Sequence, residues 1–570
     1  TEDDKSKAEI KDGSQIPSGG IYAKNTSQTD TYTVQNSIEF NHVFKEDHVV
    51  NLMAVSEIRQ IKTDGLSATY YGWLPERGET FSPAITTGYT NLLATGALNP
   101  TLDKSTKNYV SWIFTGSYSY RDKLLLNGNV RMDGSNQFGS NPKYRFLPIW
   151  SISGKYTLSK ENFLKDSDII SYLAFRASYG IQGNVDGGTS PDLVLKIGSQ
   201  NSITGHNEST VAYLPNPDLR WEKTESFNLG IDLALFSDRI SVVADVYKKR
   251  GTDMIMNKNV SQSNGVQTVK INAGKVDNSG VEVGFRFVPF RTKDWDTALE
   301  INYSYNRNKL IDANEALVTN EDKLAGNGQV VGEALGTLYS YDYVGLDPES
   351  GYPVFRDMYG ETTHENDNGK IIPNYTLWSD EVNLVKSGVM TAPSQGGINL
   401  SVGWKGLRLS GSFTYQFGGV NRLSGIYGSN SNRVYDPMSN VSKEYKKRWR
   451  KSGDEAKTDI PVLYNSRVFN KLSLRTYMTG KTETKGTTMY DKSNVRVAKT
   501  DFLKMRSLSL NYVIPTKFIS KWRLDQCTIG LQATNLFTWA DKRWEGSDPE
   551  AAFATSPLTR TYTLNLNITF

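Results

Sequence analysis

The feature that most constrains the fold is an alternation of apolar and polar residues that recurs in about fifteen segments of the chain. The last segment, Tyr562–Phe570, shows it most clearly. Its apolar side chains are Tyr562, Leu564, Leu566, Ile568 and Phe570, with Thr and Asn between them. A period of two places the apolar side chains on one face of a β-strand and the polar ones on the other. A strand of about ten residues with two such faces suits a barrel that lies in lipid and has a wet interior.

The connections between these segments are alternately short and long. Short turns include 45–48 and 405–406. The long connections occupy about 62–106, 183–218, 311–395, 418–500 and 540–556. An up-and-down barrel with brief periplasmic turns and long extracellular loops predicts this order, whereas a soluble sandwich does not place every long loop on one side. We therefore predict an all-β fold, a transmembrane antiparallel up-and-down β-barrel over residues 32–570, preceded by an extracellular loop segment over residues 1–31.

Composition agrees with this prediction and excludes several kinds of site. Only 38% of the residues are hydrophobic and the mean hydropathy is −0.49, so no window offers the roughly 18 apolar residues that a membrane helix needs. A barrel strand needs only half of its residues to face lipid. The single cysteine, Cys527, excludes an internal disulfide framework and a cysteine-based zinc site. A net charge of +4 on 570 residues indicates no nucleic-acid partner.

The order of loops also sets the direction of the strands. The last strand follows a long loop, so it descends from outside and Phe570 lies at the periplasmic rim. Counting back, Tyr32–Phe44 also descends, which places residues 1–31 outside. Because a barrel in lipid must close and normally has an even number of strands, we expect an odd number of N-terminal strands to be supplied by another segment or chain.

Seven short stretches, in the same order along the chain, carry a family resemblance. They are Leu173–Asn184 (LAFRASYGIQGN), Asn216–Glu222 (NPDLRWE), Asn278–Glu282 (NSGVE), Asp347–Gly351 (DPESG), Phe502–Arg506 (FLKMR), Ala533–Thr538 (ATNLFT) and Gly546–Glu550 (GSDPE). Over residues 140–570 the chain resembles the SusC/RagA type of TonB-dependent outer-membrane transporter.

The resemblance implies a barrel of about 22 strands around an N-terminal plug. It also implies a multi-pass location in the bacterial outer membrane, among lipid and lipopolysaccharide, and active import of a bulky nutrient, an oligosaccharide or oligopeptide. A SusD-like surface lipoprotein would cap the outer loops, and TonB-ExbB-ExbD would supply energy through the plug. The chain departs from the family pattern because no plug or TonB box is visible in it, so we expect these parts, with the first strands, to be supplied separately.

Two other functions stay open at this point. The barrel could serve as a structural subunit of a larger outer-membrane complex without transporting anything, or as a passive porin. An enzyme is not expected, because the four histidines show no paired metal-ligand spacing and no nucleophile set is evident.

Aromatic residues in the predicted outer loops are the candidate substrate-binding groups, since their rings stack on sugars and their hydroxyls bond to sugars or peptides. The candidates are Tyr70, Tyr71, Trp73, Tyr339, Tyr341 and Tyr343. The other interpretation is that these residues pack the loops or contact the lipoprotein. Tryptophans near strand ends are assigned to the membrane-interface girdle, namely Trp112, Trp150, Trp404 and Trp539.

Three further features complete the predictions. Residues 365–369 (ENDNG) faintly resemble a calcium loop but lack the bidentate glutamate at the right distance, so we expect a polar turn and no cofactor or metal. The basic run Lys443–Lys451 (KEYKKRWRK) is expected to be solvated or to contact lipopolysaccharide or an acidic partner. Phe570 resembles the terminal aromatic signal by which outer-membrane assembly machinery recognises a barrel.

Overall fold

The computed structural model describes residues 19–81, 89–90, 98–137, 141, 146–184, 191–201, 203–261, 263, 265–266, 268–313, 318–365, 369–426, 442–463, 483–484, 486–544, 547–551 and 558–570. Strands dominate this part of the chain. None of its helices is both long enough and apolar enough to cross a membrane.

Fifteen strands form one antiparallel sheet in which neighbours along the chain are neighbours in the sheet. They are β1 (Gly20–Phe44), β2 (His48–Leu74), β4 (Thr101–Tyr120), β5 (Leu124–Ser135), β6 (Phe146–Thr157), β7 (Ile170–Asn184), β10 (Glu222–Leu235), β11 (Ile240–Asn259), β12 (Thr268–Phe287), β13 (Trp295–Asp312), β21 (Ser394–Trp404), β22 (Leu407–Phe417), β26 (Phe502–Ile514), β27 (Gln526–Ala540) and β28 (Thr561–Thr569). A further short strand, β3 (Thr80–Phe81), pairs with β2. This order confirms the predicted up-and-down arrangement.

The remaining elements are short and lie in the connections. Six small antiparallel pairs join β8 (Val194–Gln200) with β9 (Asn207–Tyr213), β14 (Thr337–Tyr341) with β20 (Leu384–Val389), β15 (Tyr343–Leu346) with β16 (Pro353–Phe355), β17 (Thr363–Glu365) with β18 (Ile371–Pro373), β19 (Leu377–Trp378) with β24 (Glu483–Thr484), and β23 (Val420–Arg422) with β25 (Val497–Lys499). The helices are α4 (Asn320–Ala325), α6 (Gly486–Asp491) and α7 (Thr516–Ile519), with 3-10 turns η1 (Pro75–Arg77), η2 (Leu158–Lys160), η4 (Lys443–Lys447), η5 (Asn494–Arg496), η6 (Ser520–Trp522), η7 (Lys542–Trp544) and η8 (Pro549–Ala551).

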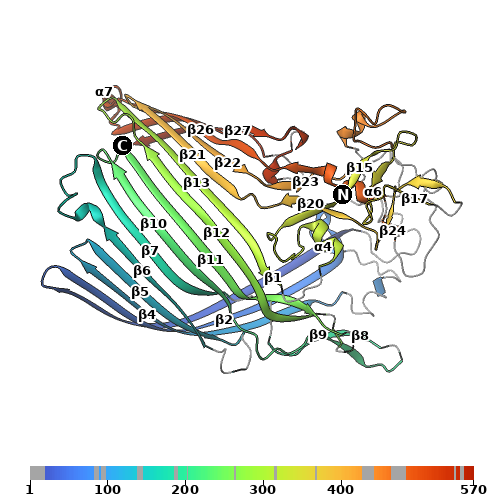
Figure 1. Ribbon diagram of the computed structural model, residues 1–570. Coiled ribbons are helices and arrows are strands. Elements are labelled where there is room, and N and C mark those ends of the chain that lie inside the picture. The colour runs from blue at the N-terminus through green and yellow to red at the C-terminus, as the bar shows by residue number, and fades with distance from the viewer. Residues whose placement is uncertain are drawn as a thin grey trace. The chain divides into compact units, whose positions relative to one another are not determined.

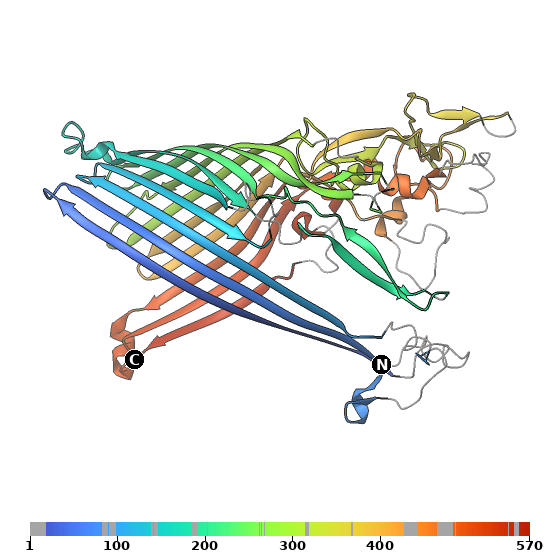
Figure 2. The same cartoon turned by 90° about the horizontal axis from the view of Figure 1, so that it is seen from below.

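The chain divides into two compact units, which we describe separately. The first unit comprises residues 1–154, 179–225 and 252–273, and the second comprises 155–178, 226–251 and 274–570, each as far as described. In the first unit, β1, β2 and β4 run together as a long ribbon, drawn in blue in Figure 2. They contain 25, 27 and 20 residues, respectively.

These lengths correct two predicted loops. Residues 20–31 were expected to be loop, but β1 begins at Gly20, and β2 and β4 extend well into the region expected as the loop 62–106. The periodicity was missed because this part of the ribbon carries polar residues on both faces. Lys104 and Asp64, for example, form an ion pair at 3.4 Å with side chains 73% and 63% exposed. The alternation of apolar and polar residues is needed only where one face of a strand contacts lipid. Two strands can pair through their backbones beyond the membrane without that alternation.

Nearer the Lys45–Asp47 turn, one face of the ribbon is apolar. Ile38 lies opposite Ala54, which in turn lies opposite Phe114. Ile38 is 77% exposed and Phe114 51% exposed. The other face is polar, and there the Asn51 amide nitrogen donates to the Ser117 hydroxyl at 3.0 Å. This band spans about ten residues of β1, which is the length that a tilted strand needs to cross the hydrocarbon core.

The second unit shows the same division between faces. One cross-strand row on its apolar face consists of Thr297, Val402, Leu409, Leu510, Leu531 and Leu564. On the opposite face, Arg408 pairs with Asp296 at 2.5 Å. Figure 1 shows β13, β21, β22, β26 and β27 side by side, with α7 and the C-terminus at one end and the short strands of the long connections at the other. The apolar face is the lipid-facing one.

The two longest connections fold together instead of remaining loops. We call the described residues between β13 and β21 and between β22 and β26 the outer subdomain. Its core contains buried side chains from both connections, namely Leu324, Tyr341, Phe355, Leu377, Ile426, Tyr445, Met489 and Tyr490. Burial of this much apolar surface accounts for a defined structure in segments that the sequence indicated only as loops.

Candidate functional site

The outer subdomain is joined across its two connections by Arg422 of β23. This guanidinium donates to the carbonyl oxygens of Tyr339, at 2.8 Å, and Leu324, at 3.2 Å. Burial lowers the pKa of Arg422 to about 10, so the group still carries its charge at neutral pH. One cation thus ties the second connection to two carbonyl groups of the first.

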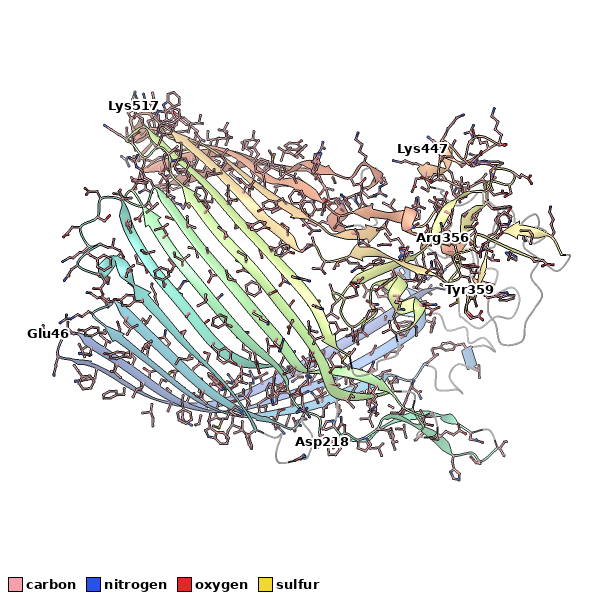
Figure 3. All side chains as sticks on the ribbon, in the orientation of Figure 1. Glu46, Asp218, Arg356, Tyr359, Lys447 and Lys517 are labelled. Atoms are coloured by element: carbon pink, nitrogen blue, oxygen red, sulfur yellow. The ribbon has the colours of Figure 1, made fainter. Side chains whose placement is uncertain are left out.

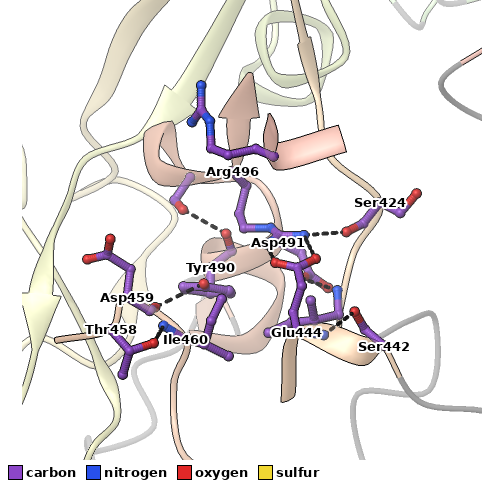
Figure 4. Close-up of polar contacts among 12 residues, drawn as sticks. Ser424, Ser442, Glu444, Thr458, Asp459, Ile460, Tyr490, Asp491 and Arg496 are labelled. Carbon is purple, nitrogen blue, oxygen red and sulfur yellow. Dashed lines mark hydrogen bonds and ion pairs between the residues drawn. The ribbon is translucent and has the colours of Figure 1, made fainter. Parts of the chain in front are cut away.

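A second buried cation, Arg496, organises the segment that follows α6 (Figure 4). Its guanidinium forms two hydrogen bonds to the Glu444 carboxylate, at 2.5 and 3.0 Å, and one to the Ser424 carbonyl oxygen at 2.6 Å. The Tyr490 ring centroid lies 5.9 Å from the guanidinium carbon, and the Tyr490 hydroxyl donates to the Asp459 carbonyl oxygen at 3.0 Å. Burial alone would lower the pKa of Arg496, but the Glu444 carboxylate raises it overall.

A cavity of about 350 Å³ lies between the outer subdomain and the free edge of β13, within the second unit. Beyond Tyr305 and Ser394, β13 continues without β21 as its partner. Instead, the Asn306 N–H donates to the Pro393 carbonyl oxygen at 2.8 Å, and the Leu310 N–H donates to the Glu333 carbonyl oxygen at 2.7 Å. The cavity opens between these two contacts.

Three asparagine side chains form the polar wall of this cavity. The Asn278 amide oxygen accepts hydrogen bonds from the amide nitrogens of Asn306, at 3.3 Å, and Asn308, at 2.9 Å. The Asn306 oxygen accepts from the Tyr247 hydroxyl at 3.1 Å, and the Asn308 oxygen accepts from the Leu335 N–H at 2.8 Å. All three amide oxygens therefore accept hydrogen bonds within the protein, whereas some of the amide N–H groups have no acceptor there.

This arrangement presents donors to a ligand. Among the described residues, the Asn278 amide nitrogen makes no hydrogen bond, and the nitrogens of Asn306 and Asn308 each use one of two hydrogens. The rest of the wall is mixed, with Leu335, Val389 and Pro393 beside Thr391 and Arg307. A partly apolar wall with a few convergent donors suits hydroxyl or carbonyl oxygens on an oligomer, as in sugars and peptides.

Glycine makes the close packing of this wall feasible. A Cβ atom on Gly280 would lie 2.5 Å from the Tyr247 hydroxyl and 2.3 Å from the Tyr305 carbonyl oxygen. Gly280 belongs to the NSGVE stretch, so this stretch holds Tyr247 against Asn306 and contributes Asn278 to the cavity. The sequence offered one missed signal, namely the asparagines at alternate positions of β13, which fall on its polar face.

Two other stretches of the resemblance contact each other. Lys504 of FLKMR is 1% exposed and donates to Glu550 of GSDPE at 2.9 Å and also to Asp548. Arg506 donates to the Glu550 carboxylate and, at 2.8 Å, to the Thr414 hydroxyl. Together these side chains form a latch that fastens the connection between β27 and β28 to β26. Burial alone would raise the pKa of Glu550, but Arg506 and Lys504 hold it below its ordinary value of 4.5.

The structure places the predicted tyrosines of the connection between β13 and β21 mainly in packing positions. Tyr341 is 5% exposed and belongs to the subdomain core, and Tyr343 packs against that core. Burial raises the pKa of Tyr343, whose hydroxyl lies 3.5 Å from the Asp459 carboxylate. Tyr339 is half-buried, with the Lys323 ammonium 5.9 Å from its ring centroid. The packing interpretation therefore suits Tyr341 and Tyr343, and a ligand role for Tyr339 stays a prediction.

The other predicted aromatic residues lie in β2 rather than in a loop. Tyr70 is 46% exposed, and Tyr71 and Trp73 are half-buried. Tyr22 of β1 packs against two of these rings in tilted geometry, with ring centroids 5.3 Å from Trp73 and 6.2 Å from Tyr70, and Phe81 lies 5.8 Å from Tyr70. The structure thus gathers a four-ring cluster at one end of the ribbon, and ligand binding there stays a prediction.

The structure also places the predicted girdle tryptophans, the basic run and part of the calcium-like stretch. Three of the girdle tryptophans are exposed on strands, namely Trp112, Trp404 and Trp539, and Trp150 is half-buried. The basic run is not simply solvated, because its Tyr445 and Trp449 side chains are buried while Lys446 and Arg450 are exposed. Residues 366–368 of the calcium-like stretch lie outside the described residues, and no metal-binding cluster occurs among those that are described.

Comparison with known proteins adds the family context. A family model described as TonB dependent receptor-like, beta-barrel matches residues 7–421. TonB-dependent receptor P3 of Formosa agariphila is 26% identical over 491 residues, which are 80% of this chain and 45% of that protein. TonB-dependent receptor SusC of Bacteroides thetaiotaomicron is 26% identical over 275 residues, which are 45% of this chain and 27% of SusC.

A solved structure extends the likeness to the fold. The structure of the RagAB peptide transporter superposes with a TM-score of 0.77 at 22% identity, covering 96% of this chain and 56% of that chain. The chain spans about half the length of the first curated relatives, with 45%, 50% and 54% of their lengths covered.

Proposed function

The chain belongs to the TonB-dependent receptor-like β-barrel family, and from this premise we propose that it forms part of an active importer of oligosaccharides or oligopeptides. Its family consists of outer-membrane proteins that cross the membrane with strands, and the lipid-facing band described above agrees with that location. The imported nutrient would enter from the side of the outer subdomain.

The observation that carries this proposal is the asparagine-lined cavity at the edge of β13. Amide donors held in place by fixed acceptors bind ligand oxygens without first having to be ordered, which lowers the entropic cost of binding. The adjoining leucine, valine and proline side chains can contact the apolar faces of sugar rings or peptide side chains. The cavity therefore suits one segment of a longer, oxygen-rich oligomer.

The proposal includes two partners. A SusD-like lipoprotein would cover the outer subdomain and deliver the oligomer, and TonB would supply energy from the periplasmic side. Support comes from the relationship to SusC and from the fold shared with RagAB, which is a peptide transporter. The substrate of this chain is proposed only as a class, because a fold shared at 22% identity does not carry a substrate with it.

Growth tests this function directly. Strains that lack the gene, or the gene of the proposed lipoprotein, are grown on single oligosaccharides and oligopeptides as the nutrient source. Loss of growth on one oligomer, with normal growth on its monomers, is the expected result. Normal growth of the gene deletion on every oligomer would contradict import and would favour the structural subunit considered from the sequence.

A further inference from the structure

An open groove of about 500 Å³ lies on the lipid-facing side of the second unit, and its lining differs in composition from that of the asparagine-lined cavity. Its lining is almost wholly apolar and consists of Pro289, Phe290, Trp295, Thr297, Ala298, Leu299, Leu400 and Val402. A groove of this size is within the range of small-molecule sites. Nothing in the proposed import route uses it.

The strand register fixes which face carries the groove. Leu299 lies opposite Leu400, Thr297 opposite Val402, and Trp295 opposite Trp404. These pairs continue into the apolar cross-strand row that ends at Leu564. The groove therefore faces the hydrocarbon region, and not the polar face that holds the Asp296–Arg408 ion pair.

A structured turn builds one wall of the groove. The Thr297 N–H donates to the Phe290 carbonyl oxygen at 2.9 Å, and the Phe290 N–H donates to the Thr297 hydroxyl oxygen at 3.0 Å. The Thr292 N–H also donates to the Trp295 carbonyl oxygen at 2.7 Å. These bonds hold Phe290 and Trp295 outward, 61% and 45% exposed. The backbone that carries this wall is therefore fixed by hydrogen bonds.

Basic side chains border the groove where the strands end. Arg291 and Lys293 are exposed in the turn between Phe290 and Trp295. Lys405 follows Trp404, and its ammonium lies 5.6 Å from the Trp404 ring centroid. Two carboxylates are close by. Asp294 lies 3.9 Å from the Lys405 ammonium, and Asp296, which forms a β-bridge with Arg291, makes an ion pair with Arg408. The four cations Arg291, Lys293, Lys405 and Arg408 outnumber these two carboxylates, so the rim carries a net positive charge.

The rim lies at the periplasmic end of the strands. β21 and β22 are joined there by only Lys405 and Gly406, with φ angles of 45° and 87°, as in the tight turns of hairpins. Short turns mark the periplasmic side of such barrels. The same end carries Lys517, which Figure 3 shows opposite to Arg356, Tyr359 and Lys447 of the outer subdomain. Trp295 and Trp404, with centroids 6.1 Å apart, occupy the headgroup level there.

From these observations we propose that the groove binds one acyl chain of an anionic glycerophospholipid of the periplasmic leaflet, with its phosphate held by Arg291, Lys293 and Lys405. The apolar lining matches a hydrocarbon chain, and the positive rim matches an anionic headgroup. A zwitterionic phospholipid would fill the groove but gain less from the rim. The groove thus fixes a boundary lipid at the junction of β12, β13 and β21.

The test is lipid retention by the natural full-length protein, purified from outer membranes and measured by native mass spectrometry. The probes are dioleoyl phosphatidylglycerol and dioleoyl phosphatidylcholine, which share acyl chains and differ in charge. We expect preferential retention of phosphatidylglycerol. Lys405→Gln should reduce that preference about fivefold, which corresponds to roughly 1 kcal/mol for one basic group near the membrane surface.

A second variant tests the groove itself. Val402→Phe narrows the groove and should lower retention of both lipids, whereas Leu531→Phe, at a lipid-facing position elsewhere in the same row, should not. Lys517→Gln serves as the charge control, since it removes a basic group from the same end away from the groove. Heat-modifiable gel migration confirms that each variant assembles. Equal retention of the two lipids by the natural protein, or equal behaviour of each variant and its control, would overturn the proposal.

Discussion

Replacing Glu444 by alanine leaves Arg496 buried without its carboxylate. The Arg496 side chain is 2% exposed and the Glu444 side chain 20% exposed. Breaking a buried ion pair by removing one partner costs about 3–5 kcal/mol. We take the lower end, about 3 kcal/mol, because Glu444 is partly solvated and the Ser424 carbonyl oxygen still accepts one hydrogen bond.

Two further variants separate charge from packing. Glu444→Gln keeps an acceptor of similar shape but loses the charge, so about 1–2 kcal/mol is expected. The double variant Glu444→Gln/Arg496→Met removes both charges and fills the space with an apolar chain, so it should be more stable than Glu444→Ala. Glu349→Ala, at an exposed position of the outer subdomain, is the control.

The assay must report on the outer subdomain rather than on the whole barrel. Hydrogen–deuterium exchange of peptides covering residues 486–499 does this, because exchange there reports local opening. A loss of about 3 kcal/mol predicts roughly a hundredfold faster exchange in Glu444→Ala, with little change in peptides from β26. Unchanged exchange in Glu444→Ala, or a double variant as labile as that single one, would refute the reasoning.

Four more outcomes are expected. Deleting Phe570 should lower the amount of protein assembled in the membrane without changing its specificity. Quantitative blotting of membranes measures this amount, and a normal amount would contradict the prediction. Lys504→Met should free the connection between β27 and β28 and speed its cleavage by added protease, and unaltered cleavage would argue against the latch. Since the pKa of Glu550 lies below its ordinary value of 4.5, its contribution is complete above that pH and is lost as pH falls through the lowered pKa, so cleavage of the natural protein should accelerate only in acid. Asn306→Leu should weaken oligomer binding about tenfold by removing a donor, as measured by calorimetry, and unchanged affinity would exclude Asn306 from the binding site.

The barrel strands were predictable because their signal is local. Alternation such as that of Tyr562–Phe570 depends only on which side chains face lipid, and it can be read over ten residues. The same reasoning failed for β1 before Tyr32, where both faces of the strand are polar and no alternation marks the pairing with β2. Strand pairing outside the membrane depends on backbone hydrogen bonds, which leave no pattern in the side chains.

The outer subdomain was not predictable for a different reason. Glu444 and Arg496 are 52 positions apart, and the basic run around Glu444 gave no sign that Tyr445 is buried. The alternation of Tyr339, Tyr341 and Tyr343 did contain a usable signal, because a period of two in aromatic residues indicates β-structure before it indicates a ligand site. Tyr339 and Tyr341 lie in β14, and Tyr343 lies in β15. The alternation did not predict burial, because β14 is buried at residues of both faces by segments far away in the chain.

The most direct test of import is accumulation of fluorescent oligosaccharides and oligopeptides by living cells. The account predicts that one of these oligomers enters wild-type cells, and that its accumulation falls to background both when this protein is deleted and when TonB is deleted. Restoring the natural gene should restore uptake, and restoring Asn306→Leu should restore it only in part. Equal accumulation of every oligomer in wild-type cells and in the deletion of this protein would contradict the account.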